Sequence, residues 1–389
     1  MSKSANGSAV KYYFIVEDAS GAIDPTAPEF KPIRYNTSTL ARNTTQVDSN
    51  EINQNRQRPL SRQGTYSTQG DIVAELSDDS FDDFLEMAMQ GTWATNVLKV
   101  GSTERSFSIL ERHSDINNAT ITAATLSATA SDSSFNDSGS GFVTAGFAVG
   151  DLITVSGFTG DAGNNGVFKI ATAAAGKLTV TDAAGAAVTL VDDAAGESVT
   201  IVAKVDFIYR GCRVNTVAVT APIDAAVGIT FGVIGTAAEA YQVPADATFA
   251  AASTSNFMVT SQGSLSEDGS TIGYATQFDF NLSNGMAPNF ALFQRAAYDV
   301  SNGIAAVGGT LSAYLPDGRL YGKQLNETET DLEVQFSDGT NTRTFTFPKV
   351  LLTQASKGVS GPGALIPQYT FSAGYDSSAA TTLTITRSA

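Results

Sequence analysis

The stretch from Gly70 to Trp93 reads Gly-Asp-Ile-Val-Ala-Glu-Leu-Ser-Asp-Asp-Ser-Phe-Asp-Asp-Phe-Leu-Glu-Met-Ala-Met-Gln-Gly-Thr-Trp. Up to Leu76, apolar and polar residues alternate, which is typical of a strand with one buried face. Beyond it the apolar residues recur at the spacing of an amphipathic helix; they are Phe81, Phe84, Leu85 and Ala88. We therefore predict a strand that leads into one short helix at about residues 79–91, with Trp93 just beyond it.

Capping residues flank this helix. Four consecutive side chains suited to the N-cap position precede it: Ser77, Asp78, Asp79 and Ser80. We predict Asp79 as the cap, with Phe81, Phe84, Leu85 and Trp93 forming the core around the helix. Gly91 stands where a left-handed C-cap would end the helix.

Five carboxylates gather around the helix start: Asp78, Asp79, Asp82, Asp83 and Glu86. The helix dipole stabilises negative charge there, so we interpret the cluster as capping and a solvated face. The alternatives are a Ca²⁺ site, which lacks the EF-hand spacing, and a hydrolase that uses Asp82 or Asp83. We predict no metal and no cofactor.

The composition limits the classes of protein. Of the 389 residues only 16% are charged, against about a quarter in a typical globular domain, which predicts large surfaces buried against other subunits. The net charge of −16 argues against general nucleic-acid affinity, because neutralising phosphates requires Lys and Arg. No apolar run approaches the ~20 residues of a membrane helix, so we predict no membrane partner.

The sequence offers little for catalysis. His113 is the only histidine and Cys212 the only cysteine, which excludes intrachain disulfides and cysteine-based metal sites. No Gly-x-Ser-x-Gly elbow surrounds any serine, and the Gly-rich segments lack the Lys and the following helix of a phosphate loop. We therefore predict that the protein is not an enzyme.

A change of composition divides the chain. From residue 115 to 204 Ala, Gly, Thr, Ser and Asp dominate, with about four short β runs between Gly and Asn turns. We predict an inserted small β domain at 115–204, between a first part of the main domain at 1–114, which includes an N-terminal arm, and a second part at 205–389. The rest of the chain is also mainly β.

A basic cluster stands out in this acidic chain. It consists of Arg42, Arg56, Arg58 and Arg62. The cluster is either a solvated hairpin loop or a loop that docks on an acidic face of a neighbouring subunit, where charge complementarity fixes the register.

Two stretches share an order of elements. Residues 33–37 precede a polar loop, the alternating segment 70–76 and the helix; residues 277–282 precede a loop, the alternating segment 308–315 and a short helix candidate. Either chance similarity or duplication of one strand–loop–strand–helix unit explains the match.

The Gly70–Trp93 stretch resembles the signature of the siphophage tail tube protein (major tail protein) family. The resemblance lies in Glu-Leu-Ser at 75–77, Ser-Phe-Asp-Asp-Phe-Leu-Glu-Met-Ala-Met at 80–89 and Gly-Thr-Trp at 91–93. Further similar pieces occur at 107–111, 209–215, 231–235 and 309–315, so the resemblance covers nearly the whole chain. Met87 and Phe81 are mild departures from the Ala and Tyr of the family pattern.

The resemblance implies a β-barrel or sandwich whose subunits form rings, stacked into the hollow virion tail tube through which DNA is ejected. The long loop would reach the adjacent ring, and the insert would decorate the exterior. A duplicated chain would form trimeric rings; without duplication, hexameric rings are expected. The implied partners are further copies of this chain, a tape-measure protein and tail terminator or tip proteins, with assembly in the host cytoplasm and DNA passing without specific binding. The alternative function is an adhesin whose insert contacts host glycan or protein.

Overall fold

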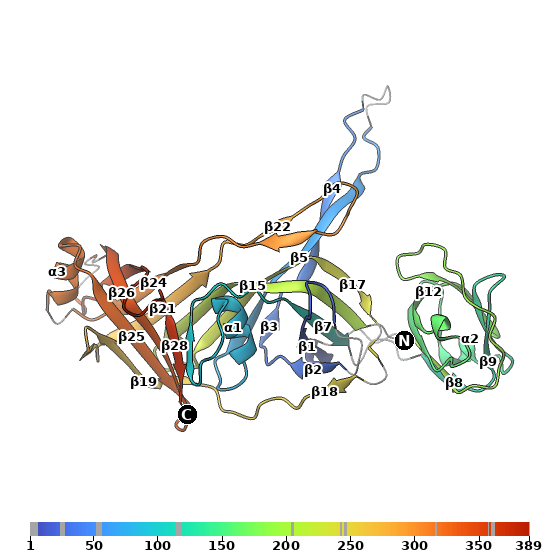
Figure 1. Ribbon diagram of the computed structural model, residues 1–389, viewed down its shortest axis with the longest axis horizontal. Helices are drawn as coiled ribbons and strands as arrows, with labels where there is room; N and C mark the ends of the chain where they lie inside the picture. Colours follow the sequence, from blue (N-terminus) through green and yellow to red (C-terminus); the bar gives the residue numbers. More distant parts are fainter. Residues whose placement is uncertain are drawn as a thin grey trace.

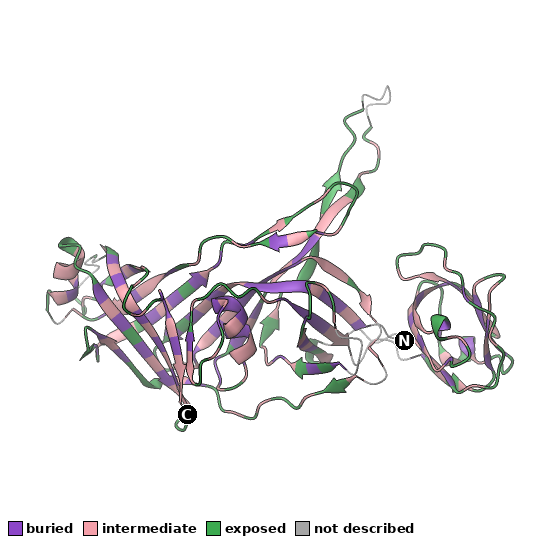
Figure 2. Cartoon of the chain, viewed as in Figure 1, coloured by how far each residue is buried: buried purple, intermediate pink, exposed green. Residues whose placement is uncertain are grey.

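The computed structural model describes residues 7–23, 28–51, 57–113, 119–203, 206–241, 243–244, 247–315, 317–356, 358 and 362–388. These residues form an elongated β body and a separate small β lobe (Figure 1). The predicted mainly β class is confirmed. Buried and exposed positions alternate along the strands of the body, as Figure 2 shows, so one face of its sheet carries the core.

The first unit of the body is an antiparallel sheet in which neighbouring strands follow the order β4, β5, β16, β15, β7, β1, β2. β3 pairs with β5 on the same side as β4, and β17 pairs with the first half of β15. The elements of this unit are β1 (Val10–Val16), β2 (Glu29–Pro32), β3 (Thr37–Ser38), β4 (Ala41–Val47), β5 (Arg62–Glu75), α1 (Asp82–Met89), β6 (Val97–Lys99), β7 (Phe107–His113), β15 (Asp206–Pro222), β16 (Gly228–Gly235), β17 (Ala237–Tyr241) and β18 (Thr248–Phe249), after a short 3-10 turn η1 (Gly7–Ala9).

The second unit repeats this arrangement in the order β21, β24, β27, β26, β25, β19, β20. A small β22–β23 hairpin lies between β21 and β24, and β28 pairs with β26 and β6. The elements are β19 (Val259–Glu267), β20 (Ser270–Thr271), β21 (Ala275–Ser283), β22 (Ala287–Asn289), β23 (Asp299–Ser301), β24 (Ala306–Ala313), α3 (Arg319–Leu325), β25 (Thr330–Ser337), β26 (Thr342–Ser356), β27 (Gln368–Ala373) and β28 (Thr384–Arg387).

The two units match in register as well as in order. A β-bulge interrupts the β15·β16 ladder between Val214 and Thr216, and a bulge interrupts β26·β27 at the corresponding place, between Leu352 and Gln354. A second pair of irregularities interrupts β15·β7 and β26·β25. Bulges are specific local features of a sheet. Because they occur at equivalent places in both units, the segments 33–76 and 277–315 resemble each other in three-dimensional structure as well as in the order of their elements.

One further ladder joins the two units. The second half of β15 pairs with β21 from Thr216↔Ser283 to Pro222↔Gln277, so both units belong to one network of strands that closes into a barrel. We call this ladder the internal seam.

The helix α1 covers the buried face of the first unit. It buries Phe84, Leu85, Met87, Ala88 and Met89, and the single large core spans residues of both units. The short helix candidate that follows residues 308–315 is present as α3.

The insert is a seven-stranded antiparallel sheet, more than the four or so strands expected, with a core of its own. Figure 1 shows it as a lobe apart from the body. Its elements are β8 (Thr120–Ala123), β9 (Leu126–Thr129), β10 (Ser134–Asp137), α2 (Phe142–Ala145), β11 (Leu152–Ser156), η2 (Ala162–Asn164), β12 (Gly166–Ala174), β13 (Lys177–Asp182) and β14 (Val199–Val202).

The expected N-terminal arm is wrong for residues 10–16 and 29–32. β1 pairs along its whole length with β7, from Val10↔His113 to Val16↔Phe107, and β2 pairs with β1. Phe14 is 3% exposed and contacts Phe84 of α1. These two segments are therefore strands of the body.

Candidate assembly surfaces

Two arginines from near the end of the chain hold the acidic start of α1. Arg343 of β26 is 1% exposed and donates to Asp78 Oδ1 at 2.9 Å and Asp82 Oδ1 at 2.7 Å. Arg387 of β28 pairs with the other oxygen of Asp82. Charge-assisted hydrogen bonds of this kind are the strong ones, so these contacts, which we call the arginine anchor, fasten α1 to the second unit.

Trp93 covers the arginine anchor. The guanidinium carbons of Arg343 and Arg387 lie 5.4 Å and 4.7 Å from the centre of its ring, within range of cation–π attraction. Its backbone N donates to Glu86 Oε1 at 2.8 Å, and its indole donates to the Asp82 carbonyl at 3.4 Å. Trp93 thus closes the anchor against the side of α1.

The predicted cap at Asp79 is wrong. α1 begins at Asp82, the N-cap position is Phe81, and no side chain there accepts a capping hydrogen bond. Asp79 instead lies in the preceding turn with φ +59°. The physical reason is that Arg343 of β26 and Arg387 of β28 hold the neighbouring Asp78 and Asp82, and these long-range contacts fix the turn before α1.

The solvated acidic face and the C-cap also need correction. Besides the two anchored aspartates, Glu86 pairs with Arg105 and Asp83 pairs with Lys31. The left-handed residue at the end of α1 is Gln90, with φ +48°. A Cβ on Gly91 would lie 2.3 Å from the Lys99 carbonyl oxygen, so this glycine serves a close backbone approach.

The other residues assigned to the helix core lie inside the body. Phe81 is 2% exposed, and Phe84 and Leu85 are 1% exposed. Phe84 sits at the centre of an aromatic cluster, with ring centres 5.0 Å from Phe14, 5.1 Å from Phe107 and 5.2 Å from Phe231. These side chains have a structural role.

The helix of the second unit is held by a related contact. Glu267 of β19 is fully buried, and its carboxylate lies 2.8 Å from the guanidinium of Arg319. Lys323, one turn along α3, pairs with the same carboxylate. In each unit, therefore, buried ion pairs position the helix against the strands.

The predicted basic cluster lies on the β4–β5 hairpin, which projects from the body in Figure 1. Arg42 stacks on Tyr66, with its guanidinium carbon 3.6 Å from the ring centre. Arg58 pairs with Asp48 at 2.8 Å, and Arg62 is exposed at the start of β5. Arg56 lies outside the described residues. The three described arginines are therefore at the surface of an extended hairpin.

The connection between β22 and β23 runs along this hairpin. Tyr66 N donates to the Arg295 carbonyl at 2.7 Å, and Ala297 N donates to the Tyr66 carbonyl at 3.0 Å. Its exposed side chains include Leu292 (84% exposed) and Phe293 (102% exposed). Neighbouring exposed apolar side chains are typical of a protein-binding surface.

Over six adjacent strand segments on both sides of the internal seam, the sheet face opposite the core is polar. It is formed by the outward side chains of adjacent strands in the segments 71–75, 228–232, 216–220, 277–281, 308–312 and 368–372. These six segments contain no Lys or Arg, and their charged residues are Asp71, Glu75 and Asp279. We call this surface the polar face.

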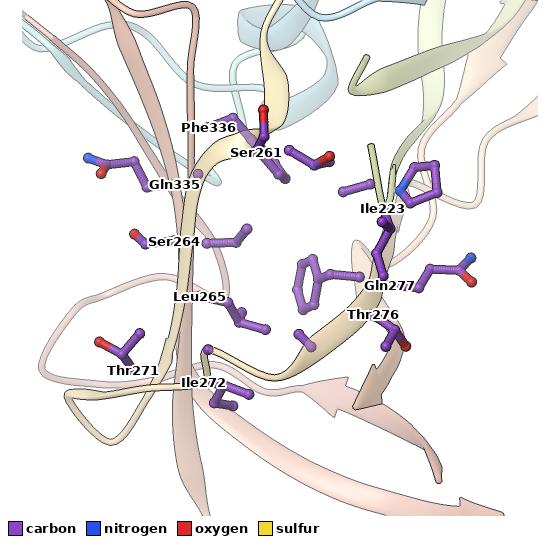
Figure 3. A pocket seen from close by; sticks show the side chains of 18 of the residues that line it. Ile223, Ser261, Ser264, Leu265, Thr271, Ile272, Thr276, Gln277, Gln335 and Phe336 are labelled. Carbon is purple, nitrogen blue, oxygen red and sulfur yellow. The ribbon is translucent and has the colours of Figure 1, made fainter. Parts of the chain in front are cut away.

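A groove of about 310 Å³ lies between β19, the end of β15 and β21 (Figure 3). Its floor includes Leu265, Ile272 and Phe336, and its rim carries Ser, Thr and Gln side chains. Asp224 is the one charged residue among those that line it. The groove is therefore lined mainly by apolar and neutral polar groups.

The residues that the structure describes contain no group of three or more His, Cys, Asp or Glu placed to bind a metal ion. Within the described part of the chain, no helix is long and apolar enough to cross a bilayer. The insert's phenylalanines are all buried; they are Phe135, Phe142, Phe147, Phe158 and Phe168.

Tyr12, Tyr209 and His113 surround Glu111 near the boundary with the insert. Tyr209 donates to Glu111 Oε2 at 2.7 Å, and His113 Nε2 lies 2.7 Å from Oε1. Burial and the nearby Glu111 carboxylate raise the pKa of Tyr12 to about 12 and raise the pKa of Tyr209 further. Cys212 is fully buried nearby, where burial raises the pKa of its thiol, so it is a core residue.

These tyrosines predict a loss of stability in alkali. An unfolded tyrosine ionises near pH 10.0 while folded Tyr12 stays neutral until about 12, so the folded state binds more protons and its stability falls as pH rises through this window. Urea midpoints measured between pH 9 and 12 should fall less steeply for Tyr12→Phe than for wild type. Tyr375→Phe, at an exposed position, is the control; an equal slope for Tyr12→Phe would contradict this account.

The fold and these surfaces define a structural protein built from two joined β units. A family model described as phage tail tube protein matches residues 7–373, and the chain belongs to this family. This is a structural family and not an enzyme family; membership implies self-association into a tube and a place in the virion tail. No curated protein matches the chain.

Proposed function

We propose that this chain self-assembles into rings that stack into the hollow tail tube through which phage DNA is ejected. The observation that carries the proposal is the internal seam. It joins two equivalent units edge to edge in one molecule, and repetition of such a join between molecules generates a closed ring.

The duplication favours three chains per ring. Each chain supplies two units with the same strand order and the same bulge positions. Three chains then give a ring of six similar units, whereas single-unit subunits would require six chains.

The polar face suits the lining of the lumen. Its side chains are mainly Ser, Thr, Asn, Gln and Gly, with a few carboxylates and no cations. The carboxylates of the polar face repel DNA phosphates within a Debye length of ~10 Å at 0.1 M salt. Because these segments lack Lys and Arg, they also lack the usual source of DNA affinity. DNA would therefore pass without specific binding.

The two extended hairpins suit contacts between stacked rings. The β4–β5 hairpin offers Arg42, Arg58 and Arg62, and the adjoining connection offers exposed Leu292 and Phe293. Such a combination of apolar and charged groups fits a docking surface on the next ring. The tape-measure protein inside the tube and terminator or tip proteins at its ends complete the expected partners, with assembly in the host cytoplasm.

Electron microscopy of the concentrated protein tests the proposal. Hollow tubes or stacked rings are expected, with a tail-tip complex added as an initiator if the chain alone remains dispersed. Dispersed monomers in both preparations would overturn the proposed function.

A positive charge on the polar face should slow DNA passage. Asn281 is exposed on β21 next to the internal seam, and Asn281→Arg would repeat around every ring as a band of phosphate-binding groups. We expect particles carrying this variant to assemble and to release DNA more slowly in a triggered ejection assay, with a delay that shrinks as salt increases. Asn281→Asp is the matched control; equal release rates for the two variants would exclude this face from the lumen.

The insert should be dispensable for assembly. It has its own sheet and its own core, and we place it on the tube exterior. Replacement of residues 115–204 by a short Gly-Ser linker should leave tubes of normal length in micrographs, with thinner walls. A variant that keeps a folded body by circular dichroism but forms no rings would contradict the exterior position.

A further inference from the structure

We infer that neighbouring chains in a ring are joined by the edge of β26 beyond Val350 in one copy and by β4 in the next, in the same register as the internal seam. The partner is a second copy of this chain. The inference rests on the proposed ring and adds to it a specific strand pairing.

Both edges lack a partner in the described part of the chain. β26 pairs with β25 only as far as Val350, and its remaining residues up to Ser356 pair with β27 on one side alone. β4 pairs only with β5, and most of its residues are exposed. Unpaired strand edges present rows of backbone donors and acceptors that a further strand can satisfy.

The duplication identifies these edges as equivalents of the internal seam. β26 corresponds to β15, because both strands carry the bulge and each pairs with the equivalent neighbouring strands of its own unit, in the same order. β3 and β4 together correspond to β21, because each pairs with the long strand that precedes the helix of its unit. In the first unit the free side of β15 is occupied by β21. In the second unit the same side of β26 is open.

Rows of paired residues give the register. In the first unit, Thr216 of β15, Gly232 of β16 and Asp71 of β5 lie opposite one another across the three strands. In the second unit, the equivalent positions are Gln354 of β26, Thr370 of β27 and Thr310 of β24. On the next strand, Thr39 lies opposite Asp71 and Asp279 lies opposite Thr310. Thr39 is therefore equivalent to Asp279, and Asn43 is equivalent to Ser283. Since Thr216 faces Ser283 in the internal seam, Gln354 faces Asn43 of the next chain.

The residues at these positions fit such a ladder. Gln354 and Asn43 are exposed in the single chain, and both would lie on the polar face. One residue further along the ladder, Ala355 would face Arg42. The Arg42 side chain stacks on Tyr66 of the neighbouring strand β5. The small Ala side chain leaves room for this stacked arginine.

The geometry permits a disulfide test. In the internal seam, Asn284 N donates to the Asn215 carbonyl at 2.8 Å, so the adjacent Thr216/Ser283 pair is of the closer, non-hydrogen-bonded type, with Cα atoms about 4.5 Å apart. A disulfide accepts Cα separations of roughly 4.4–6.8 Å. By the same register, Asn43 and Gln354 of adjacent chains should be within bonding distance.

The experiment compares three double variants in assembled tubes under mild oxidation, analysed on non-reducing gels. Asn43→Cys/Gln354→Cys should form covalent dimers and a closed trimer. Thr216→Cys/Ser283→Cys should form a disulfide without a gain in mass, which verifies the template. Arg42→Cys/Gln354→Cys is shifted by one residue, which turns the side chains to opposite faces, and should cross-link at least tenfold less. The native Cys212 is buried and supplies no competing thiol.

The outcomes separate this inference from the proposed function. The strand pairing would be overturned if Asn43→Cys/Gln354→Cys forms rings without intermolecular cross-links while Thr216→Cys/Ser283→Cys forms its internal disulfide. The proposed ring would still stand. Equal cross-linking of the shifted pair would overturn the register. If the wild-type chain forms no rings even with an initiator, the proposed function fails, and the absence of cross-links then rejects the pairing too.

Discussion

Arg343→Ala should lower the free energy of unfolding of the body by about 3–5 kcal/mol. The side chain is 1% exposed and bonds two carboxylates, Asp78 and Asp82, that are themselves largely withdrawn from water. Removing Arg343 leaves Asp78 without its guanidinium partner, whereas Asp82 keeps Arg387. Breaking a buried ion pair in this way costs more than the pair contributes. The same substitution also opens a cavity under Trp93.

The single tryptophan is a convenient probe of this effect. Trp93 lies over the arginine anchor, so its fluorescence during urea unfolding follows the body and not the insert. Lys31→Ala is the control, because Lys31 of β2 pairs with Asp83 on the same helix α1, this pair is partly exposed, and such pairs are worth at most about 1 kcal/mol. Arg343→Lys should fall between the two, since it keeps the charge and loses the two-pronged contact. A shift for Arg343→Ala no larger than that for Lys31→Ala would refute the anchor.

Phe84→Ala should destabilise the body by about 3–5 kcal/mol. Phe84 is 1% exposed and meets three other aromatic rings, from β1, β7 and β16. Its removal leaves a cavity at the point where α1 meets three strands, and the rigid sheet can collapse only partly into it. The expected measurement is a large fall in urea midpoint with unchanged slope.

Phe293→Ala is the matched control for this substitution. Phe293 is fully exposed, so the same change of side chain should leave the free energy of unfolding of the monomer within about 0.5 kcal/mol of the wild-type value. If the stacking contacts proposed above are correct, this variant should instead reduce tube length. Similar losses of stability for both variants would contradict the assignment of Phe84 to the core.

The local pattern in the sequence was sufficient for the strand and the helix but not for the helix end. Alternation up to Leu76 and the spacing of Phe81, Phe84 and Leu85 predicted both elements. The cap failed because the partner of Asp82 lies 261 residues further along the chain, beyond the reach of any local rule. A signal was nevertheless present, because Arg343 has the same alternation phase as Phe345 and Phe347, and an arginine on a buried face requires a carboxylate partner.

The duplication was visible in sequence only as an order of elements. Equivalent positions carry different residues, such as Asn43 and Ser283 at the strand edge, so side-chain identity gave little support. Ladder register and bulges are backbone properties that many sequences satisfy, and they became evident only from the strand pairing. The surfaces that join chains were equally hidden, because a free edge is defined by the absence of a neighbouring strand.

The copy number of a ring tests the central claim most directly. Symmetry determination from electron micrographs of isolated rings or tubes, supported by the mass of a single ring, measures it. If each chain contributes two units joined by the internal seam, the ring contains three chains and three insert lobes around a six-unit wall. A ring of six chains with six insert lobes would contradict the account.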